Sequence, residues 1–269
     1  MLKQRIATAA VLACLLLIAL FALPASATTL LFAATFVVGA WEWAGFGGLQ
    51  GSAARSAYAL LIGALLRLAW VWTRDPAALT LLLRCACLWW VLAFFWLAFA
   101  PRRHWPPWTL LCGIAVLVPA FAALARLQRG AGVVRGPEAV LWLFVLVFGA
   151  DIGAFFAGRR FGRLKLAPLV SPRKTWEGAL GGMAAVAAIA WAAALRFRWP
   201  AAGAVAFGCA VGLFSIVGDL TESMFKRAAG LKDSGALLPG HGGILDRIDS
   251  VAAAAPLYAL GLFGSGIFR

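Results

Sequence analysis

The chain has 269 residues and a formal net charge of +14, and 64% of its residues are hydrophobic while only 13% are charged. Its mean hydropathy is +0.92, and apolar runs of roughly 18 residues or more, long enough to cross a bilayer as a helix, recur along it. This composition excludes a soluble globular domain and predicts an all-α polytopic integral membrane protein. It also argues against nucleic acid as a partner, because the basic residues of such a protein collect in its cytoplasmic loops.

Nine runs qualify as membrane-spanning helices of a single membrane domain, residues 1–269. Their predicted limits are 5–23, 28–45, 57–73, 78–99, 108–125, 138–157, 178–195, 201–221 and 250–268. The first run is either a retained helix or a signal peptide that ends at Ala25-Ser26-Ala27, and cleavage would leave eight helices. Retention is favoured, because another apolar run follows at once.

Two connections between the predicted helices, 158–177 and 222–249, are longer and richer in charge than the others. Two helices separate them, so they fall on the same side of the membrane. The first contains six Lys or Arg residues and the second contains four, and the positive-inside rule therefore places both in the cytoplasm. The basic segment 126–135 then falls outside, against the rule. The expected location is the cytoplasmic (inner) membrane, with the site facing the cytoplasm.

The acidic residues are concentrated in the C-terminal half of the chain. Of ten, seven lie between Asp151 and Asp249. We therefore expect residues 138–269 to form the catalytic helices with their two cytoplasmic loops, and residues 1–137 to form scaffold helices. Asp151 and Asp219 each lie near the end of an apolar run, where a carboxylate is costly unless it faces a polar interior. The alternative is a helix-end carboxylate that reaches the membrane interface.

Three carboxylates could together bind a cation. Asp246 and Asp249 are three residues apart, so both point the same way if the segment is helical. With Asp219 they would form an oxygen-only cluster, which suits Mg²⁺ better than Zn²⁺. Further polar residues follow Asp219 at helical spacing: Glu222, Ser223, Lys226 and Arg227. An ordinary amphipathic helix end with a salt bridge is the alternative interpretation.

A glycine-rich stretch, Pro239-Gly240-His241-Gly242-Gly243, cannot comfortably continue a helix. It predicts a tight loop whose backbone N–H groups are open to an anion such as phosphate. A flexible turn between helices is an equally open alternative. His241 is a weak signal for a metal ligand, because it stands alone.

The other charged loop contains Ser171-Pro172-Arg173-Lys174-Thr175-Trp176-Glu177-Gly178. This stretch is typical of a helix start, with Thr175 as the candidate cap and Glu177 in the first turn. Lys174 and Arg159 are candidate phosphate ligands, unless the loop only sets the topology. Two basic loops, carboxylates of the magnesium-binding type and glycine turns together indicate phosphoryl or nucleotidyl transfer at the membrane surface.

The residues from Ser223 to Asp249 resemble the signature of the phosphatidate cytidylyltransferase (CDP-diacylglycerol synthase) family. The resemblance rests on Ser223-Met224-Phe225-Lys226-Arg227, on Lys232-Asp233 and on Leu238-Pro239-Gly240-His241-Gly242-Gly243-Ile244-Leu245-Asp246-Arg247-Ile248-Asp249. It is strong over about residues 148–250, where the run from Asp151 to Gly178 also matches. Phe155 stands where members often have tyrosine, which puts any role of a hydroxyl there in doubt.

The resemblance implies that the chain transfers CMP from CTP to phosphatidate and gives CDP-diacylglycerol and pyrophosphate for phospholipid biosynthesis. It implies Mg²⁺, with a second cation as an option, as well as contact with membrane lipids and a homodimer. The expected catalytic residues are Lys226, Arg227, Lys232, Asp233, His241 and Arg247; the substrate-binding residues are Arg159, Ser171, Lys174, Thr175, Gly242 and Gly243; the metal ligands are Asp219, Asp246 and Asp249.

Two alternative functions stay open at this point. A transferase of the same kind could use CTP with another lipid phosphate. A transporter of an anionic metabolite is a different class, and it would be expected to show inverted repeats or broken helices in both halves of the chain. The concentration of acidic residues in one half favours the enzyme.

Overall fold

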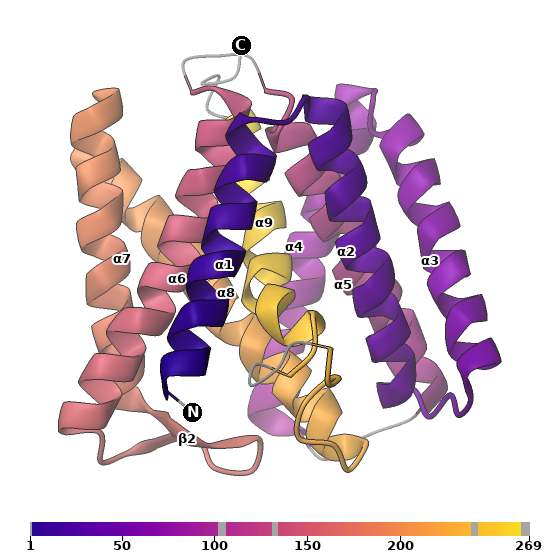
Figure 1. Cartoon of the computed structure of the whole chain (residues 1–269). Helices are drawn as coiled ribbons and strands as arrows, with labels where there is room; N and C mark the ends of the chain where they lie inside the picture. The colour runs from indigo at the N-terminus through magenta and orange to yellow at the C-terminus, as the bar shows by residue number, and fades with distance from the viewer. Residues whose placement is uncertain (1, 102–105, 131–133, 238–241, 265–269) are drawn as a thin grey trace.

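A computed structural model describes residues 2–101, 106–130, 134–237 and 242–264. Within these ranges the chain forms nine α-helices and one small β-hairpin (Figure 1). The prediction of an all-α polytopic membrane protein with about nine helices is confirmed. The residues of the alternative cleavage site, 25–27, lie in the first turn of the second helix.

The helices follow one another along the chain with short connections, apart from the two segments discussed below. They are α1 (Leu2–Phe21), α2 (Ala25–Phe46), α3 (Ser52–Trp72), α4 (Pro76–Phe99), α5 (Pro106–Leu127), α6 (Gly136–Phe161), α7 (Trp176–Phe197), α8 (Ala201–Ala228) and α9 (Leu245–Gly264). The strands β1 (Lys165–Ala167) and β2 (Ser171–Thr175) lie between α6 and α7.

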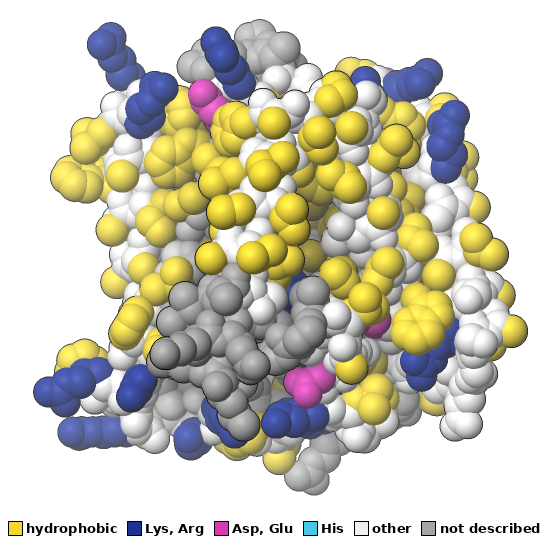
Figure 2. Space-filling view, viewed as in Figure 1, with side chains coloured by type: hydrophobic (Ala, Val, Ile, Leu, Met, Phe, Trp, Pro, Cys, Tyr) yellow, Lys and Arg dark blue, Asp and Glu magenta, His cyan; other side chains and the backbone are white. Residues whose placement is uncertain are grey.

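Seven of these helices, α2 to α8, are long and apolar enough to cross a membrane. Helix α1 adds a shorter apolar stretch, Ala10–Phe21. Figure 2 shows hydrophobic side chains over the middle of one face of the molecule, with Lys and Arg gathered toward its two ends. This distribution fits a multi-pass membrane protein, because charged side chains are costly in hydrocarbon and collect at its borders.

Helix α9 lies at the centre of the bundle (Figure 1). It contacts α2, α4 and α5 from the N-terminal half of the chain and α6 and α8 from the C-terminal half. Residues 251–255 are fully buried. Three of the first five residues of α9 are charged: Asp246, Arg247 and Asp249. Because other helices surround α9, it can bring these charges to the polar end of the bundle without exposing its middle to lipid.

Small residues allow α6, α7 and α8 to approach one another closely. A Cβ atom added to Gly153 of α6 would lie 2.7 Å from the carbonyl oxygen of Gly181 in α7. A Cβ atom added to Gly182 would lie 2.7 Å from the carbonyl oxygen of Ala150. Such glycine contacts are common between membrane helices, where close backbone packing replaces the hydrophobic drive. They place the ends of α6, α7 and α8 side by side, which is where the hairpin begins.

The connection expected as a loop over 158–177 is more ordered than the sequence indicated. Helix α6 continues to Phe161, and β1 and β2 then pair antiparallel, with Lys165 opposite Thr175. The hairpin was not predicted, because strands of three and five residues carry too short an alternation to recognise.

The predicted start of the helix after the hairpin is confirmed. Thr175 is the N-cap of α7, and its hydroxyl oxygen accepts a hydrogen bond from the backbone N–H of Gly178 at 3.1 Å. The carboxylate of Glu177 in the first turn accepts the backbone N–H of Leu164 at 3.1 Å. Both contacts fix the orientation of the hairpin relative to α7.

The second charged connection is shorter than the predicted 222–249. Helix α8 extends to Ala228, and α9 begins at Leu245. Glu222 and Lys226 form an (i, i+4) ion pair within the part of α8 that lies past the predicted limit. The hairpin, the described residues 229–237 and 242–244 and the start of α1 all lie at the same end of the bundle (Figure 1), which agrees with the expectation that both charged connections share one side.

We predict that Gly153→Leu destabilises the bundle by about 1–3 kcal/mol, because the added atoms meet backbone that cannot move aside. Gly203→Leu is the matched control, since a Cβ atom there meets nothing within 4 Å. Thermal unfolding of both variants in the same detergent measures the difference. Equal melting temperatures for the two variants would contradict the close packing of α6 and α7.

Candidate active site

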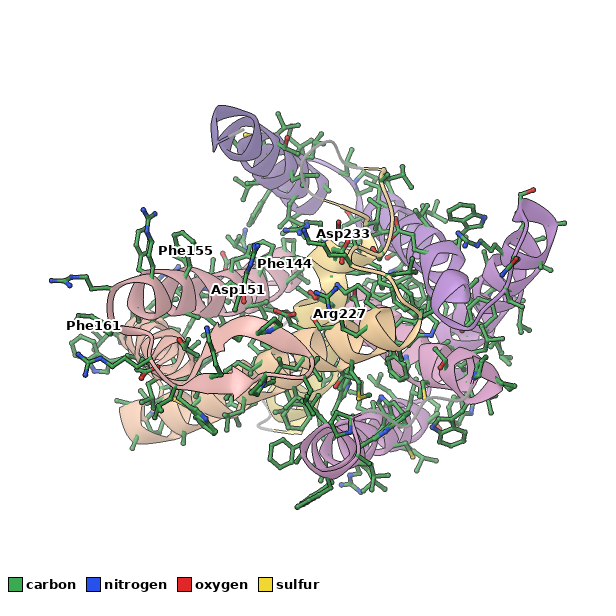
Figure 3. The ribbon with its side chains drawn as sticks, turned by 90° about the horizontal axis from the view of Figure 1, so that it is seen from below. Phe144, Asp151, Phe155, Phe161, Arg227 and Asp233 are labelled. Atoms are coloured by element: carbon green, nitrogen blue, oxygen red, sulfur yellow. The ribbon has the colours of Figure 1, made fainter. Side chains whose placement is uncertain are left out.

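The polar end of the bundle is formed by the last turns of α8, the first turn of α9, the hairpin and the described residues 229–237 and 242–244. Figure 3 views this end from below. Asp151 of α6, Arg227 of α8 and Asp233 lie toward the middle of this view, whereas Phe155 and Phe161 of α6 lie toward its edge. The charged groups therefore converge from segments that are far apart in the sequence.

Lys226 lies between two carboxylates at the centre of this end. Its Nζ is 2.5 Å from Oδ1 of Asp246 and 3.0 Å from Oε1 of Glu222. The three side chains are no more than 9% exposed. One cation thus faces two anions in a nearly dry environment, where an unpaired charge would be costly. The pairing joins the end of α8 to the start of α9.

Asp246 also organises the segment before α9. Its Oδ2 accepts the backbone N–H groups of Ser234 and Gly243, each at 2.9 Å, and the hydroxyl oxygen of Ser234 lies at the same distance. The amide of Gly243, which the sequence indicated as open to an anion, is therefore used within the protein. Gly242 has a φ of 79°, in the left-handed region that favours glycine. The two glycines allow the chain to turn tightly around the Asp246 carboxylate.

A second ion pair joins the hairpin to α8. The Nζ of Lys174 in β2 contacts Oδ2 of Asp219, and the hydroxyl of Ser223 lies 3.4 Å from the other carboxylate oxygen. Both side chains of the pair are about a quarter exposed, at 29% for Lys174 and 25% for Asp219.

Arg227 holds the hairpin and the following segment against α8. Its Nε donates to the carbonyl oxygen of Val170 at 3.4 Å, and its Nη1 donates to the carbonyl oxygen of Leu231 at 3.2 Å. Val170 lies in the turn of the hairpin and is buried. These contacts give Arg227 a structural part in the site, whatever else it binds.

Several of the predicted site residues are exposed at this end. Lys232, Asp233, Arg247 and Arg159 are all exposed, and none of the four forms an ion pair within the described ranges. The other predicted residues occupy the positions given above, and Ser171 begins β2. His241 lies outside the described residues, so its predicted role stays a prediction.

The predicted metal ligands Asp219, Asp246 and Asp249 do not form one grouped set of donors. Within the described parts of the chain, no three His, Cys, Asp or Glu side chains are grouped so that they could hold a metal ion. Asp219 and Asp246 are each paired with a lysine. Mg²⁺ does not require a complete protein cage, because it is usually held by one or two carboxylates together with substrate phosphates. The oxygen-only donors are therefore compatible with Mg²⁺ that arrives with a nucleotide.

Three polar residues of this end were missed as candidate site residues: Glu42, Glu222 and Ser234. Glu42 is the acidic residue of α2, and its side chain is fully buried next to the start of α9. Its signal was available, because a carboxylate inside an apolar run is rarely without a partner. Its partners could not be predicted, since they are about 200 positions away along the chain.

We predict that Lys226→Met costs about 3–5 kcal/mol of stability, because it leaves two buried carboxylates without their cation. Lys165→Met is the matched control, since Lys165 is exposed on β1, and surface substitutions usually change stability by about 0.5 kcal/mol or less. Thermal unfolding in detergent compares the two. A Lys226→Met protein as stable as the control would contradict the ion-paired arrangement.

Comparison with known proteins identifies the family. Residues 3–263 match the model of the family described as the Cytidylyltransferase family. The phosphatidate cytidylyltransferase of Pseudomonas aeruginosa is 45% identical over 273 residues, which cover 99% of this chain and 98% of the relative. That of Haemophilus influenzae is 37% identical over 96% and 98%, and that of Brucella suis is 42% identical over 59% and 57%. The chain with this polar, ion-paired end belongs to the Cytidylyltransferase family.

Proposed function

We propose that the chain is a phosphatidate cytidylyltransferase, which transfers CMP from CTP to phosphatidate and releases CDP-diacylglycerol and pyrophosphate. The observation that carries the proposal is the 45% identity, over almost the full length of both chains, to a relative of that name. The polar end of the bundle supplies the cationic groups that such a reaction needs. Neither the transporter nor a transferase for another lipid phosphate receives support from the family match or from the relatives' names.

The chemistry is an in-line displacement at phosphorus. A phosphate oxygen of phosphatidate forms a bond to the α-phosphorus of CTP, and the bond from that phosphorus to the bridging oxygen of pyrophosphate breaks. The attacking oxygen is already an anion, so the reaction does not depend on a general base to remove a proton. The task of the protein is to hold two phosphate-bearing substrates in line and to offset their negative charge.

The exposed cations are the groups available to bind those phosphates. Arg159 comes from the end of α6, Lys232 from the segment after α8, and Arg247 from the first turn of α9. Lys174 is engaged by Asp219, so it can bind a phosphate only by exchanging that partner. Lys226 is enclosed by its two carboxylates and acts by holding Asp246 in place.

Mg²⁺ is the cofactor that we propose for this site. Asp219, Asp246 and Asp249 are the candidate carboxylates, and one or two of them together with the nucleotide phosphates would hold the ion, because the three are not grouped as one protein site within the described residues. The ion would offset charge on the nucleotide phosphates. Without the ion, Lys174 contacts an oxygen of Asp219, and Lys226 contacts an oxygen of Asp246.

We further propose that the polar end faces the cytoplasm from the inner membrane. Both charged connections lie at this end, and the positive-inside rule favours the cytoplasm for them. CTP would then reach the site from water, while phosphatidate would arrive with its acyl chains in the lipid. The homodimer implied by the family resemblance stays a prediction.

The function is tested with purified protein in detergent, phosphatidate, Mg²⁺ and CTP labelled in its cytidine. We expect label to enter the lipid as CDP-diacylglycerol. Arg247→Met should lower kcat/KM by about 100-fold, as loss of a charge-stabilising donor does elsewhere. Arg74→Met is the matched control at the other end of the bundle, and it should change activity by less than about threefold. No labelled lipid product from the folded wild-type protein would overturn the proposal.

The metal proposal predicts a different pattern. Chelation with EDTA should abolish activity, and added Mg²⁺ should restore it. Asp219→Asn should raise the Mg²⁺ concentration needed for half-maximal activity by about tenfold or more, because it removes one ligand charge. Glu138→Gln at the start of α6, away from the polar end, is the control for loss of a carboxylate. An Asp219→Asn enzyme with the wild-type Mg²⁺ requirement would remove Asp219 from the ligand set.

A further inference from the structure

Glu42 is a buried carboxylate that the proposed reaction does not use directly. It comes from α2, in the half of the chain expected to be scaffold, and its side chain is fully buried. Its Oε2 accepts the hydroxyl of Ser234 at 2.9 Å and the backbone N–H of Leu245 at 2.8 Å. Its Oε1 accepts the backbone N–H of Ile244 at 3.1 Å. No Lys or Arg within the described ranges forms an ion pair with it.

The three donors lie at the two ends of one segment. Ser234 is at its beginning, and Ile244 and Leu245 are at its end, where α9 starts. A single carboxylate from another helix therefore joins Ser234 to Ile244 and Leu245, which lie on the other side of residues 238–241 in the sequence. The N–H groups at a helix start have no partner within the helix and carry its positive dipole end, so they suit a buried anion. Glu42 thus caps α9 from outside that helix.

The glycines beside this contact explain part of the segment's sequence. A Cβ atom on Gly235 would lie 2.6 Å from Oε1 of Glu42. A Cβ atom on Gly243 would collide with both carboxylate oxygens of Glu42 and with the Ser234 hydroxyl. The segment can therefore close around Glu42 only because these positions lack a side chain.

The same contact continues into the proposed active site. The Ser234 hydroxyl lies 2.9 Å from Oε2 of Glu42 and 2.9 Å from Oδ2 of Asp246. Asp246 in turn contacts Lys226, which is paired with Glu222. Glu42 is therefore connected through one hydroxyl to the carboxylate and the cation at the centre of the polar end.

We propose that Glu42 is a positioning residue for the cytidylyl transfer. It holds Ser234, Ile244 and Leu245 so that Asp246 keeps its place relative to Lys226. The effect on catalysis rests on the proposed function, whereas the clamp on the segment can be measured without it. A displacement of reacting groups of about 1 Å can lower a rate by about 100-fold, so a clamp of this kind should affect kcat.

Glu42→Gln is the most informative variant, because it keeps the shape of the side chain. Each carboxylate oxygen accepts a backbone N–H, so either orientation of the amide turns its NH₂ group against one of these donors. Ser234→Ala removes only the hydroxyl that bridges to Asp246. Asp75→Asn is the matched control: Asp75 caps α4, where its carboxylate accepts the N–H groups of Ala77 and Ala78, at the opposite end of the bundle.

Three measurements are made on each variant in the same detergent: thermal unfolding, kcat and KM for CTP and phosphatidate, and amide hydrogen exchange. We expect folded Glu42→Gln to lose about tenfold or more in kcat, as loss of an outer-shell partner does elsewhere, with KM changed by less than about threefold. Amides of 242–249 should exchange faster than in the wild type. Ser234→Ala should lose activity in the same direction, and the double variant should be no worse than Glu42→Gln alone, because both act through one contact network.

The outcomes separate positioning from mere support of the fold. A loss of activity that only follows the unfolded fraction, with wild-type kcat per folded molecule, would overturn the proposal. If Glu42→Gln does not fold, Ser234→Ala decides: a folded Ser234→Ala protein with wild-type kcat and wild-type exchange would overturn it as well. Asp75→Asn should keep wild-type kcat and wild-type exchange in 242–249.

The proposal and the underlying function can fail separately. Absence of CDP-diacylglycerol from the wild-type enzyme would end the proposed function, while faster exchange of 242–249 in Glu42→Gln would still support the clamp. Normal product formation by the wild type, with normal exchange and normal kcat in Glu42→Gln, would end the clamp and leave the function intact.

Discussion

The polar end of this protein depends on one buried cation, the ammonium group of Lys226, which is shared by Glu222 and Asp246. A charge taken out of water is tolerated only when a partner compensates it and hydrogen bonds satisfy what remains. Lys226 compensates the charge of two carboxylates on two helices. The pairing keeps the ends of α8 and α9 together and leaves Asp246 free to bind the backbone of the preceding segment with its other oxygen.

The rest of the bundle serves to bring these groups to one end. Helix α9 can carry three charges at its start because five other helices surround it. Close glycine contacts such as Gly153 against Gly181 set the ends of α6 and α7 side by side, and the hairpin that follows delivers Lys174 to Asp219. The polar end therefore combines exposed cations with more buried ion pairs, an arrangement that would suit the transfer between two phosphate-bearing substrates that we propose.

Much of the fold could be predicted from local patterns. Apolar runs of bilayer length predicted all nine helices, and the hydroxyl of Thr175 followed by Glu177 predicted the start of α7. Helical spacing predicted that most of the polar residues after Asp219 share one face of α8. The contacts of Ser223 with Asp219 and of Lys226 with Glu222 agree with this prediction. The hairpin could not be predicted, because its two short strands are held by contacts with Glu177 and Arg227 more than by their own sequence pattern.

The sequence by itself determined that the chain crosses a membrane, where its charges are concentrated and which residues resemble a known signature, because these properties depend on composition and short-range spacing. Only the tertiary structure decided which charges pair. Lys174 with Asp219 and Glu42 with the start of α9 join positions that are 45 and about 200 residues apart. Such pairs depend on how the elements pack, because their partners come from different parts of the chain and meet only when the bundle is assembled.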